Sequence, residues 1–359
     1  MNISFDKDSF LNKLQSFYNA KTLPEESEYI DFLSKSIKTL ENESINYRPL
    51  SDLKTCGGLL DFYSYEKCII VVPDLHGRAD FLLKLLNYIF PHKFISHEFL
   101  QKESNSEKEF TVLDLLINDE IKIICVGDGV HSEIRGYERW KKAYAEYNKT
   151  GNILTPEMHE EMKENISTMQ IVMELKNTFV ENFHFLKGNH ENVLNITDFQ
   201  NYSFRKFAQE GDMCRMFLQE YYGDLVLHLI NEWENLLPIC ALFKNYAVSH
   251  AEPAKKYTKD EIINYKNPAS DVIIGFTWTP NDLVEDRTVV SIYNQLTNGC
   301  QFSQNASKFL WFGGHRPVPE RYLTRQNGKY VQIHNPEKMN VAILKPGTEF
   351  NFEEDIVEV

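Results

Sequence analysis

Short apolar runs that end in polar residues recur along the chain. The five runs span residues 68–72, 121–126, 183–186, 246–248 and 309–312. Runs of this length, bounded by glycine and proline, are typical of strands that are buried on both faces of a sheet. We therefore expect five buried strands, each followed at once by a polar cluster.

Longer segments with helical spacing separate the first three runs. Apolar positions recur every three or four residues at 81–86, 137–147 and 158–183, as they do on one face of a helix. This alternation of strand and helix predicts an α/β layered fold. Three later segments extend the prediction: residues 199–235 as helical, and residues 331–333 and 341–344 as late strands of a second sheet.

The same patterns divide the chain into three parts. Residues 1–65 carry two amphipathic patterns, around Leu14 and Leu33, and predict a helical N-terminal extension. Residues 66–345 hold all five strand-like runs and form the main domain, with insertions at 98–120 and 135–180. The acidic tail, 346–359, is expected to be frayed.

Charge and composition narrow the possible classes of protein. The 359 residues carry a formal net charge of −14, which argues against broad binding to nucleic acid or to anionic membranes. No run approaches the ~20 apolar residues of a membrane span, and the polar N-terminus lacks the apolar core of a signal peptide. We expect a cytoplasmic enzyme.

The cysteines do not suggest a disulfide framework. Six cysteines are scattered along the chain without a CxxC pair. Cys68 and Cys125 lie inside strand-like runs, where buried free thiols are expected. Cys300 lies in a segment that we expect to be irregular.

The polar clusters supply the chemistry of the chain. They are Asp74-Leu75-His76, Gly127-Asp128, Gly188-Asn189-His190-Glu191, Ser249-His250 and Gly313-Gly314-His315. Together they offer two carboxylates, four imidazoles and one amide, not counting Glu191. Ligand sites on layered α/β sheets gather at the carboxyl ends of the strands, so these side chains are expected to share one site.

The first two clusters are expected to hold a first metal and to link it to a second. Asp74 and His76 are two residues apart, so both side chains can face the same way. A carboxylate with an imidazole suits Mn, Fe or Zn. The two oxygens of Asp128 can bridge two cations that lie about 3.5–4 Å apart.

The later clusters supply the second metal and an acid. Asn189 offers its amide oxygen to the second metal, and His250 and His315 complete that shell. His190 follows Asn189 directly and is poorly placed to reach the same ion, so it is the candidate general acid. Glu191 is a candidate for orienting a neighbouring group. A two-metal site of this kind predicts a phosphoester hydrolase.

In these motifs the chain resembles the calcineurin-like metallophosphoesterase superfamily, most closely its phosphoprotein phosphatase branch. That branch includes serine/threonine phosphatases and bacterial diadenosine tetraphosphatases. The matching segments, in the family's order, are Pro73-Asp74-Leu75-His76-Gly77, Gly127-Asp128-Gly129-Val130, Gly188-Asn189-His190-Glu191, Ser249-His250-Ala251 and Gly314-His315. The resemblance covers about residues 66–345.

The resemblance implies a fold and a mechanism. The fold would be a layered β-sandwich of two mixed sheets flanked by helices. Asp74 and His76 would bind the first metal, Asp128 would bridge, and a metal-bound hydroxide would attack phosphorus in line. His190 would protonate the leaving oxygen, while Asn189, His250 and His315 would bind the second metal.

The second motif departs from the family's pattern. His131-Ser132 stands where the family has Asp-Arg, so His131 replaces the acid that supports the catalytic histidine only in part. The arginine that binds substrate phosphate is also missing from its usual place. Arg135, Arg78 and Arg316 compete for that role, for which a guanidinium is well suited.

Three functions remain open from the sequence. The leading hypothesis is hydrolysis of phosphomonoesters, including phosphoserine or phosphothreonine proteins, with manganese, iron or zinc as the metal pair. The alternatives are a nucleotide or dinucleoside polyphosphate hydrolase and a catalytically impaired binding scaffold. The other six histidines, His334 among them, receive no function.

Overall fold

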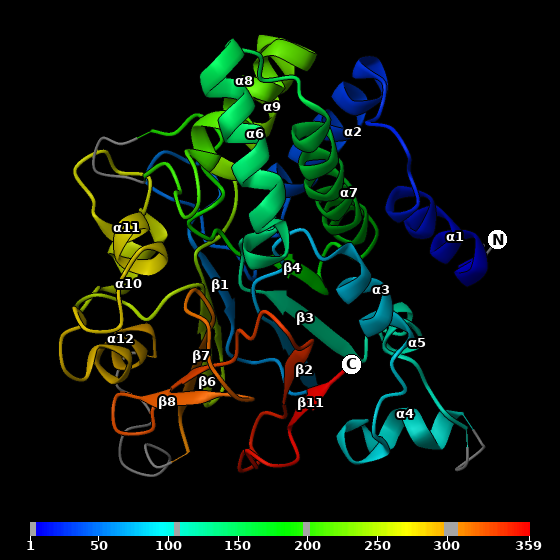
Figure 1. Ribbon diagram of the computed structural model, residues 1–359. Helices are drawn as coiled ribbons and strands as arrows, with labels where there is room; N and C mark the ends of the chain where they lie inside the picture. The colour runs from blue at the N-terminus through cyan, green and yellow to red at the C-terminus, as the bar shows by residue number, and fades with distance from the viewer. Residues whose placement is uncertain (1–4, 104–107, 197–201, 298–307) are drawn as a thin grey trace.

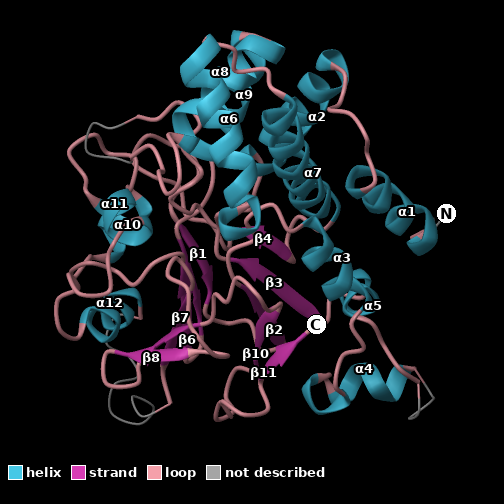
Figure 2. Cartoon of the chain, viewed as in Figure 1, coloured by secondary structure: helices cyan, strands magenta, loops and turns pink. Residues whose placement is uncertain are grey.

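Two β-sheets pack face to face between two layers of helices (Figures 1 and 2). The computed structural model describes residues 5–103, 108–196, 202–297 and 308–359. One sheet has five strands in the order β11-β10-β2-β3-β4, and the other has six in the order β1-β5-β6-β7-β9-β8. The prediction of an α/β fold with two mixed sheets flanked by helices is confirmed.

The five-stranded sheet contains the first three apolar runs as parallel neighbours. These strands are β2 (Cys68–Val72), β3 (Ile121–Cys125) and β4 (Phe183–Phe185). Two antiparallel strands extend the sheet beyond β2, namely β10 (Asn340–Leu344) and β11 (Ile356–Glu358). The carboxyl ends of β2, β3 and β4 therefore lie at one edge.

The six-stranded sheet contains the other two runs. Its strands are β1 (Leu59–Phe62), β5 (Cys240–Phe243), β6 (Tyr246–Ser249), β7 (Leu310–Gly313), β8 (Leu323–Arg325) and β9 (Tyr330–Gln332). β6, β7 and β9 are parallel neighbours. Their carboxyl ends therefore also share one edge.

Alternating side chains bury both faces of each sheet. In β2, Ile69 and Val71 belong to the core between the sheets, whereas Cys68 and Ile70 face the helices on the outer side. The outer face of the six-stranded sheet packs on a third apolar core with residues such as Phe276. Period-two alternation of mostly apolar residues thus produces four layers.

The helices form two separate layers. The layer over the five-stranded sheet contains α1 (Lys7–Tyr18), α2 (Glu26–Glu41), α3 (Ala79–Asn87), α5 (Val112–Ile117), α7 (Pro156–Thr178), α8 (Glu210–Tyr222) and α9 (Asp224–Asn235). α4 (His97–Lys102) and α6 (Tyr137–Thr150) border it. α10 (Lys259–Ile263), α11 (Val272–Thr277) and α12 (Thr288–Leu296) cover the other sheet.

Four details differ from the sequence-based expectations. The segment 252–308, which contains Cys300 and was expected to be irregular, includes the short helices α10, α11 and α12. The N-terminal region is helical in α1 and α2, but it also contributes β1, which pairs with β5. Residues 341–344 were expected in the second sheet, yet β10 pairs with β2 in the first. The tail supplies β11, whose backbone pairs with β10 instead of fraying. Strand partners depend on long-range pairing, which a local apolar pattern does not specify.

The described cysteines are free thiols, and the described helices are too short or too polar to span a membrane. Cys56, Cys68, Cys125, Cys214 and Cys240 are buried and free, whereas Cys300 lies outside the described residues. Within the described ranges, no helix is both long enough and apolar enough to span a membrane.

A cluster of buried charges ties the N-terminal region to the main domain. Glu43, just after α2, forms ion pairs with Arg48 and with Lys176 of α7. These side chains are at most 4% exposed. Burial alone would raise the pKa of Glu43, but the charges of Arg48 and Lys176 outweigh burial and hold that pKa well below its ordinary value. Glu43 is therefore an ionised carboxylate that neutralises two buried cations.

We expect Glu43→Gln to lower the free energy of unfolding by about 3–5 kcal/mol at neutral pH, because it leaves two buried cations without their counter-charge. A carboxyl group whose pKa falls on folding stabilises the protein above its unfolded pKa and loses that effect as pH falls. The difference in free energy of unfolding between Glu43→Gln and the wild type should therefore become smaller as pH falls below 4.5, the ordinary pKa of the carboxyl group.

Urea unfolding at several pH values measures this gap. Glu41→Gln, at the exposed last residue of α2, is the control and should change the free energy of unfolding by less than about 0.5 kcal/mol. Equal stabilities of the two variants would contradict the expectation.

Candidate metal and catalytic site

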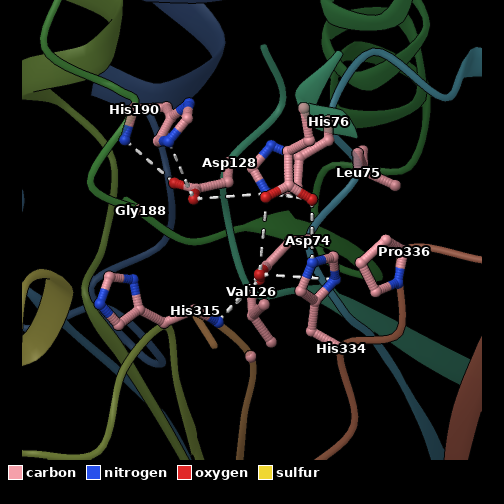
Figure 3. Close-up of polar contacts among 12 residues, drawn as sticks. Asp74, Leu75, His76, Val126, Asp128, Gly188, His190, His315, His334 and Pro336 are labelled. Carbon is pink, nitrogen blue, oxygen red and sulfur yellow. Dashed lines mark hydrogen bonds and ion pairs between the residues drawn. The ribbon is translucent and has the colours of Figure 1, made fainter. Parts of the chain in front are cut away.

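The five predicted polar clusters meet where the carboxyl ends of the parallel strands of both sheets come together. Asp74 follows β2, Asp128 follows β3 and Asn189 follows β4. His250 follows β6 and His315 follows β7. Figure 3 shows the side chains of Asp74, His76 and Asp128, from the turns after β2 and β3, directed toward one another. The parallel arrangement of the strands explains this convergence.

The turns that carry the site have unusual backbone conformations. Five residues at the site adopt a left-handed conformation with positive φ: His76 (48°), Asp128 (51°), His131 (77°), Glu133 (49°) and His315 (64°). Such residues cost about 1–3 kcal/mol each and persist only where the surrounding structure fixes them. Contacts around the site must therefore offset this strain.

Two glycines allow the turns to approach each other closely. A Cβ atom on Gly188 would lie 2.2 Å from Asp128 Oδ1, and one on Gly314 would lie 2.1 Å from Asp74 Oδ1. Any side chain at these positions would displace a carboxylate. This close approach gives a physical reason for glycine in these two motifs.

Four ligand atoms form a compact set at the second predicted metal position. Asn189 Oδ1 lies 2.9 Å from both His250 Nε2 and His315 Nδ1. The two imidazole nitrogens are 3.2 Å apart, and Asp128 Oδ2 lies 3.5 Å from His250 Nε2. His250 Nε2 can carry at most one proton, which cannot satisfy both Asn189 Oδ1 and His315 Nδ1. Unpaired lone pairs therefore converge at this position. Convergent lone pairs of O and N suit a divalent cation.

Asp74, His76 and Asp128 surround the first predicted position. His76 Nε2 lies 4.0 Å from Asp74 Oδ2 and 3.9 Å from Asp128 Oδ2. Asp128 Oδ2 thus faces both sets, as a bridging carboxylate must. The backbone N–H of His315 donates to Asp74 Oδ2 at 2.9 Å, which holds that carboxylate in place.

Backbone carbonyls orient two of the imidazoles. His76 Nδ1 lies 3.3 Å from Val130 O, and His250 Nδ1 lies 3.1 Å from Val126 O. A proton on each Nδ1 leaves the Nε2 lone pair directed into the site. Hydrogen bonds of this kind set the tautomer and ring direction of metal-binding histidines.

Glu191, a candidate for orienting a neighbouring group, is hydrogen-bonded to three backbone N–H groups. Its carboxylate accepts hydrogen bonds from the backbone N–H groups of Asp128, Gly129 and Gly188 at 2.7–2.9 Å. The side chain is 1% exposed. It therefore joins the turn after β3 to the turn after β4 and fixes the spacing of Asp128 and Asn189.

His190 lies beside both sets with its ring held by an aromatic side chain. Its Nε2 is 3.7 Å from Asp128 Oδ2. The ring stacks on Phe204 with centroids 4.1 Å apart and planes 8° apart. His131 lies against it, with ring centroids 5.1 Å apart, but the two imidazoles share no hydrogen bond and His190 Nδ1 has no partner among the described residues. Stacking therefore positions this ring.

The electrostatics of the cluster favour a bound cation. Burial lowers the pKa of His76 to about 3 and that of His250 to about 4, so both imidazoles are neutral and able to bind metal. Burial and the nearby charges of Glu191 and Asp74 raise the pKa of Asp128 well above its ordinary value. Carboxylates crowded out of water are stabilised by a metal ion, so the donor set fits two divalent cations.

The structure adds His334, which was not predicted as a site residue. Asp74, His76 and His334 present ligand atoms within 4.8 Å of one another. His334 follows β9 after Ile333, so this short strand, like the five predicted runs, leads directly to a polar side chain. That repetition of the same pattern was the available signal.

Two further groups of ligand atoms overlap this site. Asp128, His250 and His315 form one, and His76, His131 and His190 form another. Within the described residues, every such group lies in this single location.

The three candidate arginines have different surroundings. The Arg78 guanidinium donates to the backbone oxygens of Leu75, Asp74 and Lys338 and is buried. Arg135 donates to His76 O and pairs with Glu164. Of these three arginines, only Arg316 lines the cleft over the candidate metal ligands.

That cleft also contains basic and aromatic residues that were not predicted. Its lining comprises His76, Asp128, His131, Glu133, Asn189, His190, Phe204, Arg205, Lys206, Trp278, His315, Arg316 and Pro317. Arg205, Lys206 and Arg316 give the rim positive charge above an acidic floor. A bound anion would thus meet cations on both sides once metals are in place.

Comparison with known proteins identifies the family. The model of the calcineurin-like phosphoesterases matches residues 69–331. No match was found among curated protein sequences. The chain therefore belongs to the calcineurin-like phosphoesterase family, and it is a phosphoester hydrolase.

Two solved structures resemble this chain at low sequence identity, and the first of them supports the fold. A protein serine/threonine phosphatase from Saccharomyces cerevisiae, with similarity to human phosphatase PP5, has a TM-score of 0.56 and 15% identity, over 99% of this chain and 95% of that one. The cold-active protein-tyrosine phosphatase of a psychrophile, Shewanella sp., has a TM-score of 0.42 and 16% identity, over 80% and 77%.

Proposed function

We propose that the protein is a dinuclear metal-dependent phosphatase that hydrolyses phosphomonoesters. The observation that carries the proposal is the convergence of Asp128, Asn189, His250 and His315 within 2.9–3.5 Å, next to the Asp74 and His76 pair. Two divalent cations held there would activate water and neutralise the phosphoryl group. Manganese as one of the metals and a cytoplasmic location remain predictions.

Asp128, His190 and Glu191 have different roles in the proposed reaction. Asp128 faces both ligand sets and holds them at a fixed separation. His190, stacked on Phe204, is placed to donate its Nε2 proton to the departing oxygen. Its neighbour Asn189 belongs to the second ligand set, so the acid and this ligand lie on the same turn. Glu191 holds that turn in place by accepting hydrogen bonds from the backbone N–H groups of Asp128 and Gly188.

Phosphoserine or phosphothreonine proteins are the leading substrate class. The cleft opens to an exposed rim that includes Arg316 and Pro317, and such a rim suits a phosphate group carried on a large partner. Nucleotides and dinucleoside polyphosphates are the alternative, with Trp278 as the aromatic side chain in the cleft that would stack on a base.

A substrate panel tests the proposal. Metal-free protein, reloaded with manganese, iron or zinc, should hydrolyse p-nitrophenyl phosphate and phosphoserine or phosphothreonine peptides. Turnover of dinucleotides alone would favour the nucleotide hydrolase. Two bound metals per chain without hydrolysis of any phosphoester would favour the binding scaffold.

Arg316 is the expected phosphate-binding arginine. Its side chain is exposed on the cleft, and its guanidinium forms no hydrogen bond or ion pair with the described residues. Hydrogen bonds to charged groups contribute about 1.5–3 kcal/mol. Arg316→Ala should therefore lower kcat/KM by about 10- to 100-fold, and Arg316→Lys should restore only part of it.

Steady-state kinetics on a phosphopeptide, with metal content measured in parallel, checks this expectation. Arg135→Ala is the matched control, because Arg135 is already engaged with His76 O and Glu164. A larger loss in Arg135→Ala than in Arg316→Ala, at full metal content, would assign phosphate binding to Arg135.

A further inference from the structure

We propose that His334 is a ligand of the first metal and that Glu133 holds it in position. This inference rests on the proposed dinuclear site and extends it, because it gives the first metal a ligand from outside the five sequence motifs. It also makes the first position richer in nitrogen, which favours Zn, Fe or Co over Mg.

His334 lies at the edge of the sheet where the candidate metal ligands gather. β9 pairs in parallel with β7, so the turn after β9 emerges at the same edge as His315. The imidazole is completely buried. Figure 3 shows its ring beside Asp74, on the side of that carboxylate away from His190. The ring therefore borders the first ligand set and not the second.

The separation of the ligand atoms fits coordination better than hydrogen bonding. His334 Nδ1 lies 3.6 Å from Asp74 Oδ2, which is too long for a hydrogen bond, and it has no hydrogen-bond partner in the described part of the chain. Two ligands with bonds of about 2.1 Å at tetrahedral to trigonal angles lie about 3.4–3.6 Å apart. The buried lone pair of His334 Nδ1 is thus separated from Asp74 Oδ2 by the distance expected between two ligands of one metal ion.

Glu133 contacts the other ring nitrogen of His334. Its Oε2 lies 3.3 Å from His334 Nε2, so Nε2 is placed to donate while Nδ1 keeps its lone pair. A carboxylate, an imidazole and a metal in this order recur in metalloproteins, where the carboxylate fixes the tautomer and raises ligand basicity. Lys206 in turn holds Glu133 Oε1 at 2.8 Å.

An ion-pair role is the competing explanation. A doubly protonated His334 would lie between Asp74 and Glu133 as a cation, with no metal needed beside it. The two roles differ in one measurable respect. A ligand is required for the first metal to bind tightly, whereas an imidazolium would repel that metal.

Metal titration of the full-length chain distinguishes these roles. Chelator-stripped wild type, His334→Asn and Glu133→Gln are titrated with Zn²⁺ against a competing chelator, and bound metal is counted by mass spectrometry. We expect two sites in the wild type. His334→Asn should keep one tight site and bind the other about 100-fold or more weakly, and Glu133→Gln should weaken that same site by about 10- to 100-fold.

Controls make each outcome decisive. His92→Asn, which removes an imidazole bonded to Lys108 O away from the site, should retain both sites. If circular dichroism shows that His334→Asn does not fold, the test rests on Glu133→Gln. This variant is expected to fold because glutamine keeps an acceptor oxygen for His334 Nε2. Two sites of wild-type affinity in His334→Asn would overturn the ligand role, and two such sites in Glu133→Gln would overturn the coupling of Glu133 to that ligand; both outcomes leave the dinuclear proposal intact. A wild type that binds no metal would instead overturn the dinuclear proposal.

Discussion

Asp128→Asn is expected to lose at least one metal per chain and to lower kcat/KM by about 10³-fold or more. The reason is geometric, since Asp128 Oδ2 lies 3.9 Å from His76 Nε2 and 3.5 Å from His250 Nε2 and so serves both sets. Bound metals contribute several kcal/mol to stabilising transition-state charge, and each 1.36 kcal/mol is a factor of ten in rate.

The same variant should not be less stable than metal-free wild type. In the absence of metal, Asp128 is buried near Glu191 and Asp74, and both charges oppose its ionisation. Replacing it with a neutral amide of similar shape removes that repulsion. Thermal unfolding of both chelator-treated proteins, together with metal counts and kinetics, therefore separates loss of a ligand from loss of the fold.

Asp31→Asn, at an exposed position of α2, is the matched control and should behave as wild type in all three measurements. An Asp128→Asn protein with two metals and nearly full turnover would show that this carboxylate does not bridge.

His190→Asn is expected to keep both metals and to lose activity in a way that depends on the leaving group. General acid catalysis contributes about 10²- to 10⁴-fold, and the loss should fall in this range for phenyl phosphate or a phosphoserine peptide. It should be far smaller for 2,4-dinitrophenyl phosphate, because that weakly basic phenoxide departs without a proton.

Turnover of the three substrates, with metal content measured on the same preparations, tests the role of His190. His159→Asn removes a histidine that packs on Phe217, outside the site, and serves as the control. An equal loss for all leaving groups would contradict the acid role. Loss of one metal would show instead that His190 is a ligand, in line with its place beside His76 and His131.

Much of the fold, and the grouping of the candidate ligands, was predictable because the five runs are short and mostly apolar. Runs such as 68–72 become strands buried on both faces, and parallel neighbours place Asp74 and Asp128 side by side. The prediction needed only local patterns and the rule that ligands gather at the carboxyl ends of strands.

The features that were missed depend on contacts between distant segments. His334 follows a strand of three residues, and only its parallel pairing with β7 brings it to Asp74. β1 and β11 were missed for the same reason, because their partners lie far away in the sequence. The packing of Phe204 on His190 likewise joins two loops.

The sequence alone determined which side chains end the buried strands, and hence that carboxylates, imidazoles and an amide would be available at one edge. Only the tertiary structure decided which lone pairs converge and which charged groups are already engaged. Arg78 and Arg316 both adjoin metal motifs, yet one guanidinium is surrounded by backbone carbonyls and the other faces the cleft. Side-chain direction depends on packing across the two sheets, and no local sequence pattern encodes that packing.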